Sequence, residues 1–375
     1  MFITDIQTMH QKVPLKKPFK TALRTVDQAE SIIVKVEVSN GIIGWGEAAP
    51  TMMITGESIQ SIEATILYTI KPLLLGKSIL NTETIFHLLH RSCVGNSSAK
   101  AAVDIAIYDI LAQYHNLPLY QYLGGEWEDG LHNEVETDYT VSVNSPEEMS
   151  EAALQHVTDG FNILKIKVGK DSIEKDIVRI QRVRETVGPD ITIRVDANQG
   201  WKTKDAIRAI RKMEDMGLNI DLVEQPVLAS DIEGMKMVTD SVLTPIMADE
   251  TVFSPSDAFE VLKTRAADLI NIKLMKSGGI YKASIINHMA EECGVECMVG
   301  SMIESHLSVT AAVHFAASKR NIVRYDFDAP LMLVDKPTNG GIDYEINKIR
   351  IPEEPGLGIS SIKEEWRVGR GAKTT

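Results

Sequence analysis

The sequence has little cysteine, few aromatic residues and no long hydrophobic run. Three cysteines, Cys93, Cys293 and Cys297, are too few and too odd in number for a disulfide framework, so we expect reduced thiols. No apolar run approaches the ~18 residues that a membrane-spanning helix needs, which argues against an integral membrane protein. The first residues lack the basic and apolar regions of a secretory signal, so we expect a cytoplasmic protein.

Basic residues are outnumbered by acidic ones. The 39 Lys and Arg residues against 52 Asp and Glu give a formal net charge of −13, which argues against a nucleic-acid partner unless positive charge gathers on one face. A content of 44% hydrophobic and 24% charged residues is typical of a globular chain. Because single hydrophobic cores stop growing at roughly 250–300 residues, we expect the chain to divide into two parts.

From about residue 137 the chain repeats a short β-branched run, a polar or Gly/Pro break and a helical pattern. Such alternation is typical of a (β/α)-barrel or of an open doubly wound sheet. Nearly every expected strand ends in Lys, Asp, Glu or Asn, which favours a closed barrel with one catalytic rim over a single switch point. The expected strands are Thr137–Val143, Ile163–Gly169, Ile191–Asn198, Ile220–Pro226, Thr244–Glu250, Asp268–Leu274, Val295–Ser301 and Ile322–Asp328.

The first ~130 residues have a different pattern. Alternation over Ile3–Val13, Ser31–Val38 and Gly41–Gly46 predicts antiparallel strands, with a hairpin turn at residues 39–41. Helical patterns follow, and the segment after about residue 331 again contains strand-like stretches. We therefore predict an α+β capping domain over residues 1–130, completed by about 331–375, and a barrel over 131–330.

Lys165 and Lys167 stand two positions apart in one expected strand. Alternate residues of a strand share a face, so both ammonium groups would point into the barrel. Their mutual repulsion and the loss of solvation would lower an ammonium pKa, which would let one lysine act as a general base. A strand that presents both lysines to solvent is the alternative, and the motif alone is weak.

Three carboxylates, Asp196, Glu224 and Asp249, follow at the ends of the next expected strands. They lie 28 and 25 residues apart, about one βα unit each, which places them side by side on one barrel rim. Such hard oxygen ligands, without nearby Cys or His, favour Mg²⁺ or Mn²⁺ over zinc. Each acid alone could equally cap a helix, but together with the lysines they predict a shared metal site.

Lys273 ends the following strand, across the rim from Lys167. A proton α to a carboxylate is weakly acidic, so its removal requires a metal and fixed positive charge that stabilise the ene-diolate. Lysines on opposite faces of that planar intermediate could take a proton on one side and return it on the other, which inverts the carbon. Without this context, Lys273 would be interpreted as a strand-end lysine that reaches solvent.

These segments resemble a known family. The K-I-K, D-A-N, E-Q-P, A-D-E and N-I-K-L-M-K-S-G-G stretches are similar to the muconate lactonizing enzyme subgroup of the enolase superfamily, through essentially the whole chain. P-F-K-T-A-L-R-T-V, C-M-V-G-S-M-I-E and R-Y-D-F-D-A-P resemble the dipeptide epimerases within it. The resemblance implies a modified (β/α)7β TIM barrel under an α+β cap, whose loops around residues 19–25 and 49–56 close over the substrate. For residues 126–136 and those beyond about 364 we place no counterpart in the family.

The resemblance also implies roles for individual residues. Asp326 and Asp328 match a D-x-D pair that holds the ammonium group of a dipeptide; a solvated junction between strand and loop is the alternative. Arg24 matches a capping-loop arginine that contacts a glutamate side chain. The remaining implied roles are Lys167 and Lys273 as the acid/base pair, Lys165 as its assistant, Asp196, Glu224 and Asp249 as Mg²⁺ ligands, and Thr140, Ser301 and Ile303 as pocket lining.

The implied function is a Mg²⁺-dependent epimerase that inverts the α-carbon of the C-terminal residue of a dipeptide. The expected pair is L-Ala-L-Glu and L-Ala-D-Glu, from murein peptides. The family implies a homo-oligomer, and the composition predicts no nucleic-acid or membrane partner. Alternatives on the same scaffold are a lyase or cycloisomerase such as o-succinylbenzoate synthase, or an N-acylamino-acid racemase. Their substrates lack a free ammonium, which disfavours them beside Asp326 and Asp328. The complete set of lysines and acids disfavours a non-catalytic binder of acidic peptides.

Overall fold

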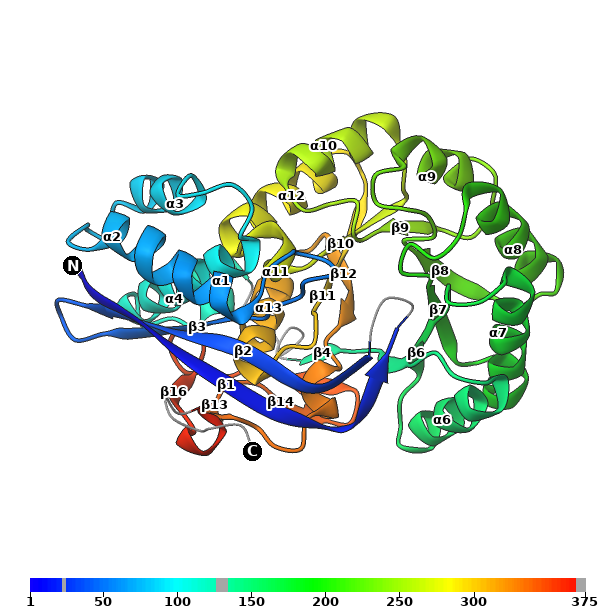
Figure 1. Ribbon diagram of the computed structural model, residues 1–375, viewed down its shortest axis with the longest axis horizontal. Helices are drawn as coiled ribbons and strands as arrows, with labels where there is room; N and C mark the ends of the chain where they lie inside the picture. Colours follow the sequence, from blue (N-terminus) through cyan, green and yellow to red (C-terminus); the bar gives the residue numbers. More distant parts are fainter. Residues whose placement is uncertain (22–24, 126–133, 369–375) are drawn as a thin grey trace.

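A computed structural model describes residues 1–21, 25–125 and 134–368. Figure 1 shows a curled sheet surrounded by helices on the right and an N-terminal sheet with its own helices on the left. Within the described residues, no helix is both long and apolar enough to cross a membrane. All three cysteines are free thiols, as expected.

The large sheet contains eight parallel strands in the order β12-β11-β10-β9-β8-β7-β6-β5. Its edges approach each other, because the Asp138 N–H donates to the Tyr325 carbonyl at 3.4 Å and the Phe327 N–H donates to Thr137 Oγ1 at 2.8 Å. All eight expected strands are present, within slightly narrower bounds. They are β5 (Tyr139–Val141), β6 (Ile163–Lys167), β7 (Thr192–Asp196), β8 (Ile220–Glu224), β9 (Ile246–Ala248), β10 (Leu269–Ile272), β11 (Glu296–Gly300) and β12 (Ile322–Asp326).

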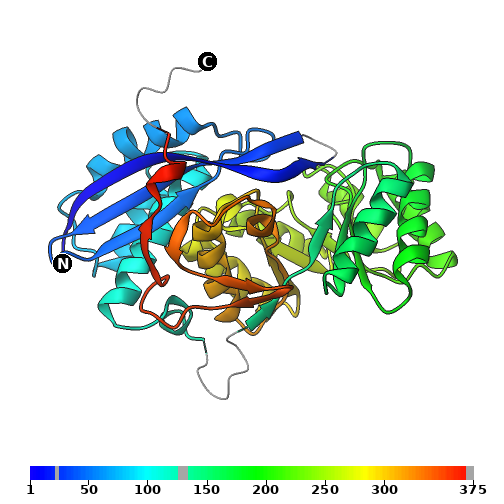
Figure 2. The same ribbon diagram turned by 90° about the horizontal axis from the view of Figure 1, so that it is seen from below.

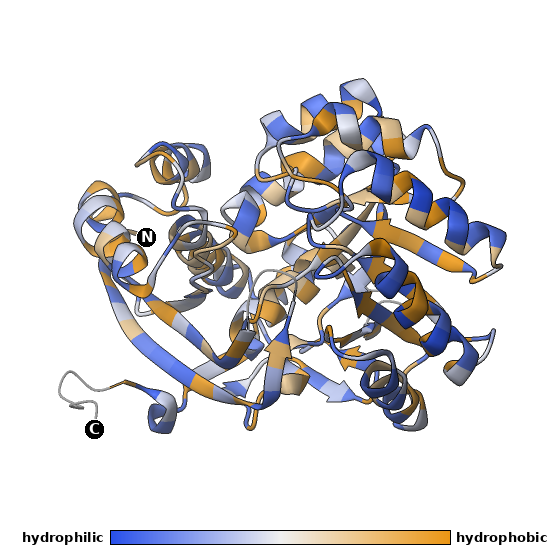
Figure 3. Cartoon of the chain, turned by 45° about the vertical axis from the view of Figure 1, so that its right-hand side comes forward, coloured by the Kyte–Doolittle hydropathy of each residue, from blue (hydrophilic) through white to orange (hydrophobic). Residues whose placement is uncertain are grey.

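Helices connect each strand to the next, and a 3-10 turn rather than a barrel helix follows β12, which confirms the expected (β/α)7β barrel. Hydrophilic residues line the outer surface of these helices in Figure 3, as expected for amphipathic helices around a core. The connecting helices are α6 (Pro146–Thr158), α7 (Ile173–Val187), α8 (Thr203–Asp215), α9 (Ile232–Thr239), α10 (Pro255–Thr264), α11 (Leu274–Ser277), α12 (Ile280–Glu292) and α13 (His306–Ala317).

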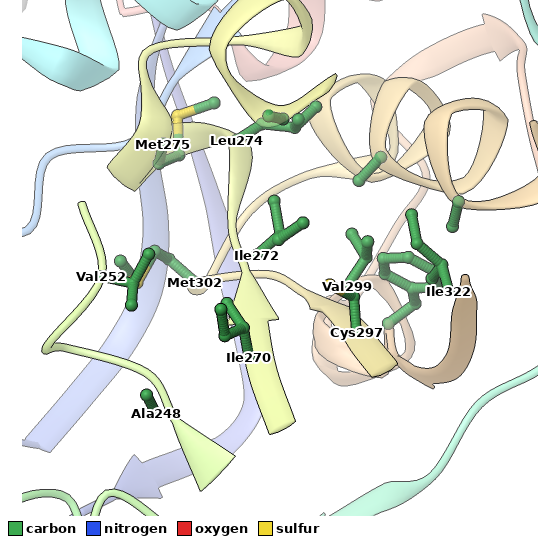
Figure 4. Close-up of a cluster of buried hydrophobic side chains, with 14 of the residues drawn as sticks. Ala248, Val252, Ile270, Ile272, Leu274, Met275, Cys297, Val299, Met302 and Ile322 are labelled. Carbon is green, nitrogen blue, oxygen red and sulfur yellow. The ribbon is translucent and has the colours of Figure 1, made fainter. Parts of the chain in front are cut away.

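Side chains along the barrel strands point alternately into the core under the helices and into the barrel interior. Ile270 and Ile272 of β10 belong to the large core cluster with the helices, alongside Val299 of β11 (Figure 4). The residue between the two isoleucines, Asn271, faces the other way and donates to Glu224 at 2.6 Å inside the barrel. Because side chains alternate across a strand, one run of residues supplies both the apolar layer and the polar interior.

The N-terminal unit, which we call the cap, has an antiparallel sheet of β1 (Ile3–Lys20), β2 (Thr25–Val38) and β3 (Ile43–Ala48). Both arms of the β1–β2 hairpin are longer than predicted, because the polar, Pro-containing stretch before residue 21 hides the strand alternation. Gly46 lets this sheet approach a helix closely, since a Cβ there would lie 1.8 Å from the Ala102 carbonyl oxygen. The cap helices are α1 (Ile59–Ala64), a π-helical turn (Thr65–Ile70), α2 (Lys71–Leu74), α3 (Thr82–His90), α4 (Ser97–Tyr114) and α5 (Leu119–Tyr122).

The C-terminal segment returns to the cap. The Val368 N–H donates to the His10 carbonyl of β1 at 2.8 Å, and this part of the chain lies across the cap strands in Figure 2. β15 also pairs with β4, so residues just before the barrel meet residues after it. The strands concerned are β4 (Glu134–Glu136), β13 (Thr338–Gly340), β14 (Asp343–Glu345), β15 (Lys348–Arg350) and β16 (Ile359–Ile362). The division at residues 130 and 331 stays a prediction.

Candidate active site

A pocket lies where the barrel strands end, and the cap contributes to its wall. Phe19, Thr21, Met53 and Ile54 come from the two stretches that were expected to close over the substrate. Arg24 lies outside the described residues. The barrel residues that line the pocket include eight of the predicted site residues, namely Thr140, Lys165, Lys167, Lys273, Ser301, Ile303, Asp326 and Asp328.

The two lysines of β6 point into the barrel, as the alternation predicts. Lys165 is 3% exposed and Lys167 is 5% exposed, whereas Leu164 and Ile166 between and beside them join the core under the helices. Lys165 forms an ion pair with Asp326, and Lys167 Nζ lies 2.5 Å from Asp196 Oδ2. The solvent-facing alternative is therefore wrong for this strand.

The electrostatic prediction needs a correction at Lys165. Burial acts to lower the pKa of Lys165, but the carboxylates of Asp326 and Glu224 outweigh it and raise that pKa well above its usual value. The same balance of burial against Asp249 and Glu224 raises the pKa of Lys273. The sequence argument counted the repulsion between lysines and omitted the acids that surround them.

The three predicted metal ligands lie at the ends of consecutive strands. Asp196 stands opposite Glu224 in the β7–β8 register, and Asp249 follows β9 directly. Asp196 pairs with Lys167, and Asp249 Oδ2 lies 2.7 Å from Lys273 Nζ. In the part of the chain that the structure describes, no three His, Cys, Asp or Glu side chains form a ready-made metal cage.

These carboxylates nevertheless suit a hard divalent cation. Glu224 is fully buried and its Oε2 atom has no hydrogen-bond partner. Burial, followed by the Asp196 carboxylate, raises the pKa of Glu224 well above its usual value. Burial and the neighbouring acids thus disfavour the charged form of Glu224, a cost that a bound cation would offset, and hard cations prefer such oxygen ligands.

Four further polar residues surround the carboxylates and were missed as site residues. Lys276 is 2% exposed, and its Nζ lies 2.6 Å from Asp249 Oδ1. Asn198 donates to Asp196 and to Glu250, and Asn271 donates to Glu224. All four fall within the D-A-N, A-D-E and N-I-K-L-M-K stretches, so their place beside recognised residues was the available signal.

Asp326 and Asp328 form a buried acidic pair at the end of β12. They are 2% and 4% exposed, which contradicts a solvated junction. Asp328 Oδ2 accepts a hydrogen bond from the Thr140 N–H at 2.6 Å, while Asp326 binds Lys165. Burial and then Asp326 raise the pKa of Asp328 to about 6. A cationic group in the pocket would be stabilised by this pair.

Two family models match the chain. One, described as enolase C-terminal domain-like, matches residues 148–366, and the other, the mandelate racemase / muconate lactonizing enzyme N-terminal domain, matches residues 3–124. The chain therefore belongs to the enolase superfamily, in its mandelate racemase and muconate lactonizing enzyme group.

Within that group the chain is similar to dipeptide epimerases over nearly its whole length. It is 61% identical to an L-Ala-D/L-Glu epimerase of Bacillus subtilis, over 96% of this chain and 97% of the relative. An L-Ala-D/L-Glu epimerase of Clostridium acetobutylicum is 50% identical over 96% and 99%. The substrate-liganded structure of the Bacillus subtilis epimerase superimposes with a TM-score of 0.94 at 60% identity, covering 96% of this chain and 99% of that one.

Proposed function

We propose that this protein is a Mg²⁺-dependent dipeptide epimerase that inverts the α-carbon of the C-terminal residue. The broader class, an isomerase of the epimerase and racemase kind, follows from relatives at up to 61% identity. One observation carries the proposal: Lys167 of β6 and Lys273, which directly follows β10, line one pocket with the acidic pair Asp326 and Asp328. Strands β7, β8 and β9 lie between β6 and β10.

The two lysines account for inversion. One amine accepts the α-proton, the C–H electron pair moves into the substrate carboxylate to give an ene-diolate, and the ammonium of the other lysine donates a proton to the opposite face. Lys165 lies beside Lys167 on the same strand face, where its fixed positive charge would stabilise the ene-diolate. Atoms and charge balance, because the proton lost on one side is replaced on the other.

Asp196, Glu224 and Asp249 would hold the Mg²⁺. When bound, the ion would polarise the substrate carboxylate and so make the α-proton more acidic. Solved structures of dipeptide epimerases from Enterococcus faecalis and Cytophaga hutchinsonii are described as complexes with Mg and a dipeptide. The unpartnered Glu224 Oε2 supports the same ligand set here.

Asp326 and Asp328 would bind the free α-ammonium of the dipeptide. Their burial makes an opposite charge favourable, and Thr140 fixes Asp328 through its backbone N–H. We propose L-Ala-L-Glu and L-Ala-D-Glu as the substrate pair, in turnover of murein peptides, with Arg24 contacting the glutamate side chain. The names of the relatives at 61% and 50% identity support the pair.

Proton NMR in D₂O tests the proposal. L-Ala-L-Glu with Mg²⁺ and the protein should lose its Glu α-proton signal while the second diastereomer appears. The comparison substrate is N-succinyl-L-Arg, because an N-succinyl-L-Arg/Lys racemase of Bacillus cereus is 40% identical to this chain. Turnover of the N-acylated compound alone would overturn the dipeptide assignment, and an inert protein with both would overturn the reaction.

A further inference from the structure

Buried carboxylates of the cap hold parts of the chain outside the cap. Asp104 and Asp109 of α4 and Glu47 of β3 are each at most 1% exposed. Asp109 accepts from the Leu357 N–H at 2.9 Å, and Glu47 accepts from the Ser305 N–H at the start of α13 at 3.0 Å. These carboxylates have no place in the proposed reaction, so their burial requires another explanation.

Asp104 binds the first turn of barrel helix α12. Its Oδ1 atom accepts the Ile280 N–H at 2.6 Å and the Tyr281 N–H at 3.4 Å, groups that helix geometry leaves without partners. On the other side, His90 Nε2 lies 3.3 Å from Oδ2. Gly279 makes the contact possible, because a Cβ there would lie 2.3 Å from Asp104 Cγ.

This contact lies at the end of the short segment that carries Lys273. We call residues 273–280 the Lys273 turn. The Ser277 N–H donates to the Lys273 carbonyl at 3.0 Å, and the Gly279 N–H donates to the Leu274 carbonyl at 2.9 Å. Ser277 Oγ also donates to the Gly279 carbonyl at 3.0 Å. Hydrogen bonds within the Lys273 turn therefore connect the Asp104 contact at Ile280 to the backbone of Lys273.

The segment that follows the other lysine is held differently. In residues 167–176, the Lys167 turn, the Gly169 N–H donates to Asp176 Oδ2 at 3.0 Å. Trp201 Nε1 donates to the same oxygen at 3.0 Å, and Arg179 Nη1 donates to Asp176 Oδ1 at 2.8 Å. All of these groups belong to the barrel, whereas the Lys273 turn is held by Asp104 of the cap in addition to the barrel contact between Lys276 and Asp249.

We infer that Asp104 is a positioning residue of the cap that holds Lys273 in its reactive place, so that the cap supports one of the two proton-transfer steps. The inference rests on the proposed two-lysine reaction. Because a displacement of about 1 Å can cost up to 100-fold in rate, loss of the Asp104 contact would slow the step at Lys273 more than the step at Lys167.

Exchange of the substrate α-proton with solvent distinguishes proton transfer at Lys273 from proton transfer at Lys167. Each epimer is incubated with Mg²⁺ in D₂O, and deuterium uptake is followed before inversion occurs. Lys273→Arg and Lys167→Arg first establish which epimer gives its proton to which lysine, because arginine stays protonated. The epimer that gives its α-proton to Lys273 is called the Lys273 epimer, and its counterpart the Lys167 epimer. Asp104→Asn should then slow α-proton exchange of the Lys273 epimer by about tenfold and change that of the Lys167 epimer by less than about twofold.

Asp109→Asn is the matched control, an equally buried carboxylate on the same helix that binds Trp45 and Leu357 instead of α12. It should change exchange of both epimers equally, even if the melting temperature falls. If Asp104→Asn does not fold, His90→Gln removes the neighbour of Oδ2 and should give the same one-sided loss in smaller measure. Equal losses on both sides, or none, would overturn the inference, whereas a wild-type protein inert towards both epimers would overturn the reaction.

Discussion

The two lysines that face the pocket from β6 and from the end of β10 occupy similar positions on the rim but have different supports. The Lys167 turn is fixed by Asp176 and its barrel partners, whereas the Lys273 turn ends at Asp104 of the cap. The Lys167 turn is therefore supported by the barrel, whereas the Lys273 turn is held both by the contact of Lys276 with Asp249 in the barrel and by Asp104 of the cap. The cap thus contributes to the frame of the catalytic rim as well as to the pocket wall.

Metal removal should lower activity more than any other change, because it affects proton transfer at Lys167 and at Lys273 equally. Dialysis of the protein against EDTA should abolish epimerisation and α-proton exchange from either epimer, since the acids Asp196, Glu224 and Asp249 would lose the ion that activates the substrate. NMR in D₂O measures both rates. Added Mg²⁺ should restore them, and full exchange in the chelated protein would contradict the metal assignment.

Replacement of either lysine should separate the two sides. Lys167→Arg and Lys273→Arg should each lower epimerisation by about 1000-fold, because an arginine cannot take the proton. Each variant should still exchange the α-proton of the epimer that faces the intact lysine. Loss of exchange from both epimers in both variants would argue against independent proton transfer on two sides.

Asp326→Asn should impair the binding of both epimers of the substrate. The change removes one of two buried charges, so the KM for L-Ala-L-Glu should rise by at least about tenfold. Dipeptides with an acetylated amino group make the comparison, because they carry no ammonium to lose. Equal losses with free and acetylated dipeptides in initial-rate assays would refute ammonium recognition by Asp326.

Asp176→Asn is the barrel-side counterpart of the Asp104 experiment. It weakens the support of the Gly169 and Trp201 N–H groups, so exchange of the Lys167 epimer should fall by about tenfold while the Lys273 epimer is spared. Asp205→Asn, an acid on α8 that pairs with Arg208 at the surface, is the control. If Asp176→Asn slowed only the Lys273 epimer, the assignment of supports would be reversed.

Much of this arrangement could be predicted from the sequence because it depends on local alternation. The strand period places Lys165 and Lys167 on one face, and the βα spacing places Asp196 and Glu224 side by side. The support of Lys273 could not be predicted, because Asp104 and Ile280 are 176 residues apart and nothing in the pattern of α4 marks one buried acid as a partner of another helix. The predicted direction of the lysine pKa shift was wrong for a related reason. The pKa of Lys165 depends on Asp326, which lies on a strand far away in the sequence.

Low pH should lower the stability of the fold without distinguishing the two proton-transfer steps. His314 lies on α13, whose N-terminus is held by Glu47, and its Nδ1 accepts from the Tyr120 N–H of α5 at 3.1 Å. Burial lowers the pKa of His314 to about 3, from an ordinary value of 6.5. Between these values the unfolded chain binds a proton that the folded chain does not.

The contribution of His314 to the free energy of unfolding should therefore be fully present above pH 6.5. As the pH falls below 6.5, this histidine should lower the folding equilibrium constant by about tenfold per pH unit. His314→Asn should flatten that dependence in urea unfolding measured between pH 7 and pH 4, although it lowers stability at pH 7. His87→Gln, an exposed histidine on α3, should leave the slope unchanged. An unchanged slope in His314→Asn would show that the folded and unfolded chains bind a proton at His314 equally well, and the contact between α13 and α5 would then tolerate a charge that its burial makes costly.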